Sequence, residues 1–459
     1  MRVDSVTASA ELSIRHRRFL LTIHVTVQHF TERSVLVNVI IMSRFYQFPK
    51  KLKFTEIYGD RLPVFRIQRK PDISCSRNDW SINIEGRTSQ TIAYIDFAKA
   101  FDSVCHSKLL YKLSQYGICG PLLNLIESFL SGRTHRTRIG DDLSDLAYIS
   151  SGVVQGSCLG PILFVLFIND LCDVFTDTVT LKLYADDVKL YSSIKTNSLD
   201  TAADLQEQLD KLAIWAEIWQ LPISYSKCCV LSLGRYHSGP ARLFTMNDHN
   251  ILPVEQAVDL GVSVDREMKF SLHIASISCK AHKRANLIIR CFHSKNIHSL
   301  VAAYKVYVRP ILEYSSVSWN PYLIKDIKAL ESVQRRFTKR LPGMEKLTYH
   351  QRLRILELDS LELRRVRADL LFTYKLVFGL IDASLHDFFV PRFNEARRGH
   401  DYKLYLPVCK SNIRSNSFNY RVIQKWNSLP SSTDFTSLKR FHKSLAHKVL
   451  LPYCKVFFI

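Results

Sequence analysis

The sequence alternates most regularly between apolar and polar positions near residue 180, and this pattern predicts a short β-hairpin. Apolar residues occupy every second position of Val179–Leu183, and the apolar pattern resumes at Val188. Such alternation is typical of a half-buried strand, and two such runs joined by a tight turn form a hairpin. Asp186 and Asp187 therefore stand at the tip of an apolar hairpin, where two carboxylates are costly unless a cation neutralises them. Taken alone, the pair also fits an ordinary turn, because Asp is a common turn residue.

Apolar runs elsewhere predict further strands and many helices. The run Thr91–Ile95 is a strand that ends at Asp96, and Ser34–Met42 is a buried strand in an N-terminal segment without clear periodicity. Helical spacing, with glycine or proline at several boundaries, predicts the other elements. The predicted helices are Ser103–Tyr116, Pro121–Leu130, Ile162–Ile168, Leu199–Trp219, Leu272–Phe292, Ser299–Tyr314, Lys325–Arg340 and Leu361–Gly379. The tryptophans of the helix that ends at Trp219 are expected to pack in the core.

The segment Arg133–Ile149 is predicted to be a second hairpin, which turns at Gly140, Asp141 and Asp142. Gly-Asp-Asp is also a catalytic triplet in some polymerases. Here its flanks are polar and alternate poorly, whereas a catalytic copy would lie between strongly apolar strands. We therefore interpret these three residues as a turn.

Charge and composition favour a polyanion as the partner of this chain. Its 459 residues are 47% hydrophobic, which is enough to build a core and excludes general disorder. The formal net charge is +21, divided into a net +7 for residues 1–75, −5 for residues 76–280 and +19 for residues 281–459. Basic flanks around an acidic centre suit a nucleic acid polymerase. Scattered surface lysines explain the charge equally well.

Cysteine usage and hydropathy indicate an intracellular protein. The eleven cysteines include no CxxC pair and no Cys/His cluster at zinc spacing, so free thiols in a reducing compartment are the simpler interpretation. No apolar run approaches the ~20 residues that span a bilayer. The stretch Phe19–Val27 is interrupted by His24 and lacks a cleavage site, which argues against secretion. We expect a nuclear or cytoplasmic protein without a membrane partner.

Three carboxylates and a glycine-rich loop are the candidate chemistry. If the strand before Asp96 adjoins the hairpin of Asp186 and Asp187, the three carboxylates meet at one edge of a sheet. Mg²⁺ prefers oxygen ligands and often takes one or two carboxylates plus substrate phosphates, and two such ions can serve an in-line phosphoryl displacement. Between these sites, Ser151–Phe164 repeats glycine every four residues around Gln155. Small residues allow a base pair to approach closely.

These segments, taken in order, resemble the motifs of a known enzyme family. The chain is similar to reverse transcriptases of non-LTR retrotransposons, of the jockey-like, LINE type. The matching segments are Tyr94–Val104 (YIDFAKAFDSV, motif A), Ser151–Phe164 (SGVVQGSCLGPILF, motif B), Tyr184–Asp187 (YADD, motif C), Leu221–Gly234 (motif D), Leu260–Asp265 (primer-grip hairpin) and Ser417–Phe441 (C-terminal signature). The resemblance covers roughly residues 78–445.

The resemblance implies a fold and a function. The implied fold class is α+β: a right-hand polymerase palm, made of an antiparallel sheet with packed helices, followed by a helical thumb and C-terminal region, with the fingers largely missing. The implied activity is RNA-directed DNA polymerisation, in which two Mg²⁺ ions, or Mn²⁺, support nucleotidyl transfer from deoxynucleoside triphosphates to a DNA primer on an RNA template. Residues 1–75 stay unassigned, residues 76–265 are the palm, and residues 266–459 are the basic thumb and C-terminal region.

The resemblance also assigns the carboxylates. Asp96 and Asp186 would hold the metal ions, and Asp187 would be a supporting carboxylate that is also counted among the metal-binding residues. Phe97 would supply at most a backbone carbonyl near the metal.

Four further motif residues are assigned to substrate. Phe101 stands where the family places a ring against the nucleotide 2′ position, which favours deoxynucleotides; core packing is the alternative. Gln155 and Gly156 would contact the incoming nucleotide and the template base. Lys227 would be the motif D lysine that protonates or steadies the leaving pyrophosphate. A plain surface lysine is the alternative for Lys227.

The sequence also departs from the family pattern. No fingers motif is recognised in residues 1–75, and Val154 replaces the proline that usually precedes the Gln-Gly pair. The simplest hypothesis is a retrotransposon copy truncated at the N-terminus. The alternative function is a catalytically inactive nucleic-acid-binding remnant. A metal-dependent nuclease is a weaker alternative, because no general-base histidine lies near the carboxylates in sequence.

Overall fold

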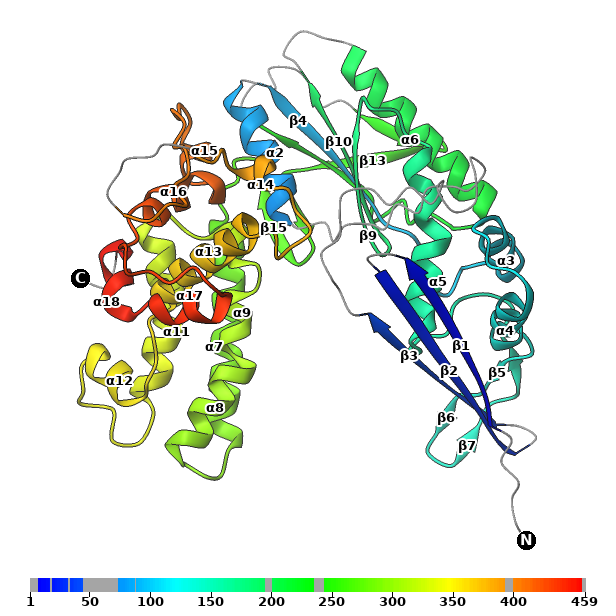
Figure 1. The fold of residues 1–459 in the computed structure, drawn as a ribbon, viewed down its shortest axis with the longest axis horizontal. Coiled ribbons are helices and arrows are strands. Elements are labelled where there is room, and N and C mark those ends of the chain that lie inside the picture. The colour runs from blue at the N-terminus through cyan, green and yellow to red at the C-terminus, as the bar shows by residue number, and fades with distance from the viewer. Residues whose placement is uncertain are drawn as a thin grey trace. The chain divides into compact units, whose positions relative to one another are not determined.

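The computed structural model describes residues 7–16, 19–31, 34–43, 73–86, 88–194, 200–234, 243–392 and 399–455. The chain divides into two compact units, one of residues 1–67 and 99–170 and one of residues 68–98 and 171–459. Both units contain helices and strands (Figure 1). The predicted α+β fold class is therefore confirmed.

Among the residues that the structure describes, the first unit contains a three-stranded sheet and three helices. The sheet is antiparallel in the order β1-β2-β3, with β1 Thr7–His16, β2 Phe19–Thr31 and β3 Ser34–Ser43. The helices are α3 His106–Gln115, α4 Gly120–Leu130 and α5 Leu159–Ile168. Strand β3 confirms the strand predicted at Ser34–Met42, whereas the predicted burial of its side chains lies outside what is described.

The described part of the first unit also contains two nested strand pairs. The outer pair is β5 Thr134–His135 with β8 Ala147–Tyr148, and the inner pair is β6 Arg138–Ile139 with β7 Asp142–Leu143. The chain reverses at Gly140, whose φ is +63°, and the residues on both sides of it are exposed. The Gly-Asp-Asp triplet is thus a surface turn, as predicted.

A buried lysine holds the end of α5. Lys112 in α3 donates to the carbonyl oxygen of Phe167 at 2.6 Å and to the Asp170 carboxylate at 2.5 Å. Burial lowers the pKa of Lys112 to about 8, although Asp170 acts in the opposite direction. The last carbonyls of a helix have no partner within the helix, so this ammonium caps α5 and stabilises the helix that follows the glycine-rich loop.

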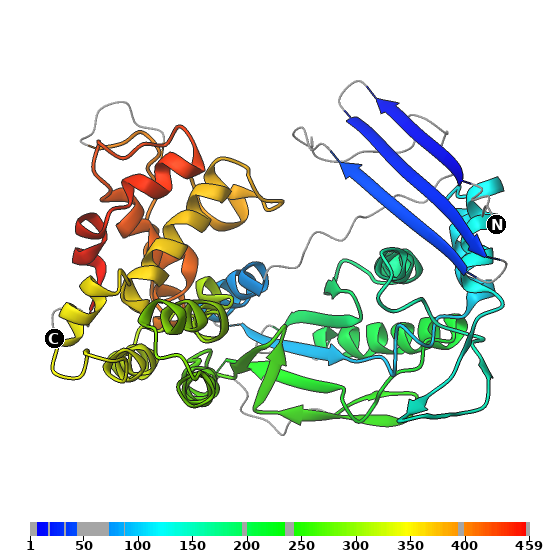
Figure 2. The same ribbon diagram turned by 90° about the horizontal axis from the view of Figure 1, so that it is seen from below.

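The second unit contains a six-stranded sheet (Figure 2). Its order is β12-β13-β11-β4-β10-β9, and all neighbouring strands are antiparallel except the parallel pair β11 and β13. The strands are β4 Ser89–Ile95, β9 Thr180–Tyr184, β10 Asp187–Ile194, β11 Cys229–Leu233, β12 Phe244–Met246 and β13 His249–Val254. Helix α6, Asp200–Trp219, packs against β10 and β12. Trp215 of α6 is buried as expected, whereas Trp219 is half-buried.

A separate hairpin packs on one face of this sheet. It consists of β14 Gln256–Asp259 and β15 Val262–Asp265. Ala257 and Val264 of the hairpin share a hydrophobic cluster with Tyr191 of β10 and with Trp80 of α2, which spans Ile73–Glu85. The burial of these apolar groups holds the hairpin and α2 against the sheet.

The rest of the second unit is helical, as predicted. Its helices are α7 Ser271–Cys291, α8 Ile297–Tyr307, α9 Arg309–Glu313, α10 Ser316–Trp319, α11 Ile324–Lys339, α12 Tyr349–Ile355, α13 Leu361–Val377, α14 Leu385–Phe388, α15 Asn412–Ser415, α16 Phe418–Asn427, α17 Leu438–Ser444 and α18 His447–Leu450.

The prediction of one helix at Ser299–Tyr314 was wrong. The helix is interrupted at Val308, between α8 and α9, because Pro310 has no N–H to donate within a continuous helix. Proline is instead favoured in the first turn of a new helix, where it stands in α9. No helix in the described ranges is long and apolar enough to cross a membrane.

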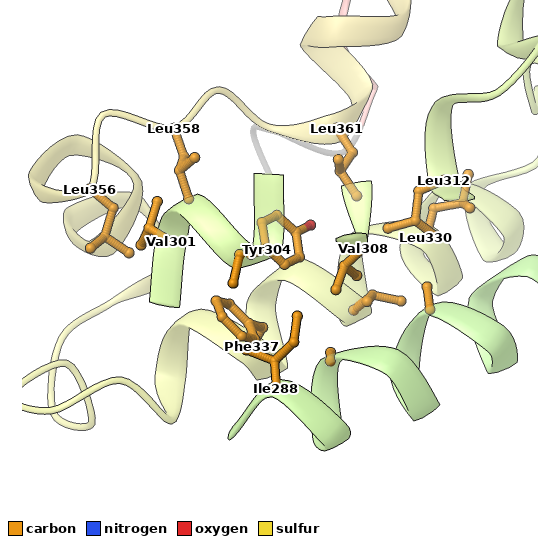
Figure 3. Packing of buried hydrophobic residues seen from close by; sticks show 14 of the residues in the cluster. Ile288, Val301, Tyr304, Val308, Leu312, Leu330, Phe337, Leu356, Leu358 and Leu361 are labelled. Carbon is orange, nitrogen blue, oxygen red and sulfur yellow. The ribbon is translucent and has the colours of Figure 1, made fainter. Parts of the chain in front are cut away.

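Two hydrophobic clusters hold these helices together. In the first, the rings of Tyr304 and Phe337 stack with centroids 4.8 Å apart, and Ile288 and Leu361 pack around them (Figure 3). The second cluster includes Tyr374, Phe418, Trp426 and Phe441 from α13, α16 and α17. The helical region therefore has cores of its own beyond that of the sheet.

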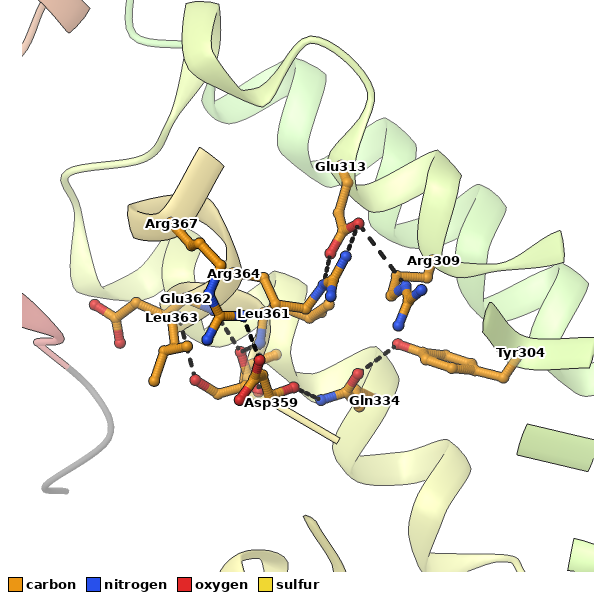
Figure 4. Close-up of polar contacts among 12 residues, drawn as sticks. Tyr304, Arg309, Glu313, Gln334, Asp359, Leu361, Glu362, Leu363, Arg364 and Arg367 are labelled. Carbon is orange, nitrogen blue, oxygen red and sulfur yellow. Dashed lines mark hydrogen bonds and ion pairs between the residues drawn. The ribbon is translucent and has the colours of Figure 1, made fainter. Parts of the chain in front are cut away.

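Polar contacts tie the same helices beside the first cluster. The Tyr304 hydroxyl donates to Gln334 at 3.1 Å, and the Arg364 guanidinium binds the Glu313 carboxylate through two nitrogens (Figure 4). These contacts join α8 to α11 and α9 to α13. Paired in this way, the polar groups do not bear the full cost of leaving water.

Candidate active site

Strand register places the predicted carboxylates side by side. Ile95, the last residue of β4, pairs with Val188 in β10, so Asp96 and Asp187 follow at neighbouring positions of the two strands. Asp187 also pairs with Tyr184 across the β9–β10 hairpin, whose turn contains Ala185 and Asp186. The expectation that the two strands adjoin in one sheet is therefore confirmed.

The hairpin tip has an unusual backbone. Ala185 has a φ of +53°, in the left-handed region that residues other than glycine rarely adopt. Such conformations persist only where surrounding structure imposes them, and they are frequent at functional sites. Here the conformation belongs to the turn that carries Asp186.

The carboxylates repel one another. Burial, together with the charges of Asp186, Asp96 and Asp259, raises the pKa of Asp187, and only Lys189 acts in the opposite direction. Neighbouring like charges disfavour the ionised form, and a nearby cation restores it. The end of this sheet is therefore a site where a cation is electrostatically favoured.

Lys227 lies beside Asp96, at the end of the sheet where the carboxylates meet. Its Nζ is 2.9 Å from Oδ2 of Asp96, and this hydrogen bond raises the pKa of Lys227 although 68% of the side chain is exposed. The backbone holds the segment there, because the N–H of Ser224 donates to the carbonyl oxygen of Asp96 at 2.8 Å. Lys227 is thus an immediate neighbour of a candidate metal ligand.

Phe97 contributes little besides its backbone. The side chain is 2% exposed, and its ring centroid lies 6.4 Å from that of Trp215 in α6. A ring buried in the core is not available to a substrate, which agrees with the limited role that the resemblance implies for Phe97.

The other predicted site residues lie in the first unit. The ring of Phe101 stacks on Phe164 of α5, with centroids 4.3 Å apart. Gln155 donates through Nε2 to Oδ1 of Asp102 at 2.7 Å. Gly156 has a φ of +80°, and a Cβ added there would meet nothing within 4 Å. The positive φ, and not a lack of space for a side chain, therefore explains why a glycine stands at position 156.

Gly152, unlike Gly156, has no space for a side chain. A Cβ added to it would lie 2.8 Å from Cα of Asp102, and its φ is +89°. Asp102 also accepts a hydrogen bond from Ser151 through its backbone oxygen at 2.9 Å. The start of the glycine-rich loop is thereby packed closely on the residue that orients Gln155.

Sequence reasoning missed Asp102, Lys189 and Asp259. Asp102 stands beside the matched residue Phe101 but carries no pattern of its own. Lys189 gave no signal of its own, because it falls on a polar position between Val188 and Leu190 of an alternating strand. Asp259 was not detectable, because its relation to the carboxylates depends on long-range packing.

The residues can be compared with the needs of a divalent ion. Among the residues described, no group of three or more His, Cys, Asp or Glu side chains is arranged to hold a metal. Mg²⁺, however, usually takes one or two carboxylates and completes its shell with phosphate and water. Asp96 and Asp186 offer hard oxygen donors, and the Lys227 ammonium already accompanies Asp96. This donor set fits an ion that binds together with a phosphorylated substrate.

A largely antiparallel sheet with one carboxylate after a central strand and two at the tip of the adjoining hairpin is typical of the palm of a nucleic acid polymerase. The model of the family described as "Reverse transcriptase (RNA-dependent DNA polymerase)" matches residues 37–270, just over half of the chain. The chain belongs to the reverse transcriptase family. The match begins within the N-terminal segment, where no motif was recognised.

Curated relatives come from mobile elements. The RNA-directed DNA polymerase from mobile element jockey of Drosophila melanogaster is 29% identical over 277 residues, which cover 58% of this chain and 30% of the relative. Its counterpart from Drosophila funebris is 28% identical, with 58% and 29% covered. The chain thus spans less than a third of the length of these relatives. Among solved structures, telomerase from Candida albicans has a TM-score of 0.34 at 10% identity, covering 63% of this chain and 53% of that chain.

Proposed function

We propose that this chain is an RNA-directed DNA polymerase of the non-LTR retrotransposon type, which extends a DNA primer on an RNA template. The observation that carries this proposal is the convergence of Asp96, Asp186 and Asp187 at one end of the palm sheet in a member of the reverse transcriptase family. Residues 76–265 would act as the palm, and residues 266–459 as the thumb and C-terminal region.

Asp96 and Asp186 would bind two Mg²⁺ ions, or Mn²⁺, with Asp187 in support. When bound, such ions stabilise negative charge on the attacking and leaving oxygens of a phosphoryl transfer. Burial, followed by the charges of Asp186 and Asp96, raises the pKa of Asp187, and this supports the assignment because a bound cation relieves the repulsion among the three carboxylates. Asp96 and Asp186 would be the residues that hold these ions, and the ions would supply charge stabilisation beside the primer terminus and the triphosphate.

Lys227 would serve the leaving group. Its ammonium carries a proton whose pKa the Asp96 carboxylate raises, so the side chain is cationic at neutral pH. A cation that can donate a proton to the departing pyrophosphate lowers the cost of its developing charge. Its contact with Asp96 supports this role over that of an unrelated surface lysine.

Phe101, Gln155 and Gly156 would select the substrate. A ring at position 101 leaves no room for a 2′-hydroxyl, and its stacking on Phe164 stiffens it against displacement. The Gln155 amide is oriented by Asp102, which suits a residue that must present a donor and an acceptor in one direction. These roles come from the family resemblance, and the contacts support them.

Primer extension tests the proposal. The full chain is incubated with Mg²⁺, deoxynucleoside triphosphates and a labelled DNA primer annealed to an RNA template. We expect extension by the wild type and a loss of at least about 10³-fold in Asp186→Asn, because the carboxylate supplies charge stabilisation that the amide cannot. Binding of the primer–template, measured separately by filter retention, is expected to persist.

Asp142→Asn is the matched control. It makes the same substitution in an exposed Gly-Asp-Asp turn, so extension should stay at the wild-type rate. A wild type that binds the primer–template but never extends it, at any Mg²⁺ or Mn²⁺ concentration, contradicts the proposal and leaves the inactive nucleic-acid-binding remnant.

A further inference from the structure

A buried ion pair joins the hairpin of the carboxylates to the hairpin β14–β15. Lys189 Nζ lies 2.7 Å from Oδ2 of Asp259, and the two side chains are only 7% and 4% exposed. The ammonium also stands 5.4 Å from the centre of the Trp80 ring. Residues 189 and 259 are 70 positions apart, so the contact exists only through folding.

The two partners occupy informative positions. Side chains alternate along a strand, so Lys189 shares a face of β10 with Asp187, two residues away. Asp259 is the last residue of β14 and pairs with Val262 across the turn. Leu260 and Gly261 form that turn with φ values of +45° and +79°, as in a tight two-residue hairpin.

The turn is held on a second side as well. The hydroxyl of Tyr314 donates to the carbonyl oxygen of Leu260 at 3.1 Å. Tyr314 lies between α9 and α10, so this contact ties the turn to the helical region. Lys189 therefore provides the attachment that faces the carboxylates, and Tyr314 provides the one that faces the helices.

A buried ion pair is weak evidence for stability, because both charges lose their hydration. An apolar pair of similar volume would pack at least as well. An apolar pair would, however, allow the β14–β15 hairpin to slide relative to β10. A charged hydrogen bond specifies both the distance and the direction of the contact. A role in positioning therefore explains the pair better than a role in stability.

We propose that Lys189 and Asp259 are positioning residues that fix the turn Asp259–Val262 relative to the Asp187 carboxylate. This inference rests on the proposed function, because Leu260–Asp265 resembles a primer grip. The pair would set the position of the primer terminus against the reacting phosphate. Reaction rates are sensitive to displacements of about 1 Å at such a terminus.

A variant that removes both charges tests the inference. Single substitutions leave an unpaired buried charge and can unfold the protein, so we choose the double variant Lys189→Met/Asp259→Leu. We expect its melting temperature to stay within a few degrees of the wild type. Its kcat for primer extension should fall at least tenfold, with the KM for deoxynucleotide unchanged within twofold. Amide hydrogen exchange across residues 256–265 should accelerate at least tenfold, while exchange in β4 stays the same.

Lys182→Met is the matched control. Lys182 lies opposite Lys189 across β9 and β10 and receives the same Lys→Met substitution, but it makes no ion pair with Asp259. Lys182→Met should leave kcat for primer extension and hydrogen exchange across residues 256–265 at wild-type values.

The outcomes separate this inference from the proposed function. A folded double variant that extends at the wild-type rate, or unchanged exchange across residues 256–265, overturns the positioning role. A wild type without any extension refutes the proposed function instead, and hydrogen exchange then decides alone whether the pair fixes the turn.

Discussion

At the scale of single residues, burial shifts the protonation of a histidine in the helical region. His273 of α7 is 4% exposed, its Nδ1 accepts a hydrogen bond from the N–H of Ser263 at 3.3 Å, and its ring packs edge-on to Trp319. Burial, followed by the charges of Arg77 and Lys280, lowers the pKa of His273 to about 4. The folded protein therefore keeps this ring neutral at a pH where the unfolded chain has already protonated it.

This difference predicts a loss of stability in mild acid. Between pH 6.5 and about 4 the unfolded state binds the additional proton, so the contribution of His273 is complete above pH 6.5 and declines as the pH falls towards 4. At pH 5 we expect a loss of about 1 kcal/mol, which allows for partial hydration of the ring. His273→Asn keeps an acceptor for Ser263 but does not titrate. Its melting temperature should fall less between pH 7 and pH 5 than that of the wild type; equal falls contradict the prediction.

At the scale of elements, a buried carboxylate holds the start of α13. Glu331 of α11 accepts hydrogen bonds from the backbone N–H groups of Leu361 at 3.1 Å and Glu362 at 3.3 Å, and the Tyr349 hydroxyl donates to it. The first N–H groups of a helix have no partner within the helix and carry partial positive charge. One carboxylate thus joins α11, α12 and α13.

Glu331→Ala should therefore be strongly destabilising. The substitution leaves two backbone donors and a buried hydroxyl without their acceptor, at a cost of about 2–5 kcal/mol. We expect the melting temperature to fall by roughly 3–7 °C. Glu345→Ala, at an exposed position, is the control and should change it by less than about 1 °C. A fall in Glu331→Ala no larger than in this control rules out the capping role.

At the scale of the whole molecule, positive charge is concentrated in the helical region. Residues 281–459 carry most of the net charge of +21. On α7 and α11, which pack together, Lys283, Arg284, Arg335 and Arg336 are exposed. Burial, and then the charge of Arg336 on α11, lower the pKa of His282 on α7. Such a surface suits phosphate groups of any sequence.

Binding to a primer–template should therefore weaken steeply with salt. For about five phosphate contacts, the logarithm of the association constant should fall with the logarithm of salt concentration at a slope of about −4. Arg336→Gln should make that slope shallower by about 1. Lys443→Gln, at an exposed position on α17, is the control and should leave the slope unchanged. A slope near zero for the wild type excludes binding through phosphate contacts.

The sequence by itself determined the local elements and the chemistry. Alternation around residues 179–191 and the Ala-Asp-Asp turn specify the β9–β10 hairpin, because periodicity and turn preference act between neighbouring residues. The same locality explains why the Gly140 turn and most helices were predicted. The break at Val308 was the exception, since Pro310 outweighed an otherwise continuous helical pattern.

Only the tertiary structure decided which side chains meet. The sheet order β11-β4-β10 brings Lys227 to Asp96, and the packing of a separate hairpin brings Asp259 to Lys189. No local pattern encodes these contacts, because they depend on strand order and on the burial of surfaces far apart in the chain. The carboxylates could be named from sequence, whereas the residues that adjust their charge and position could not.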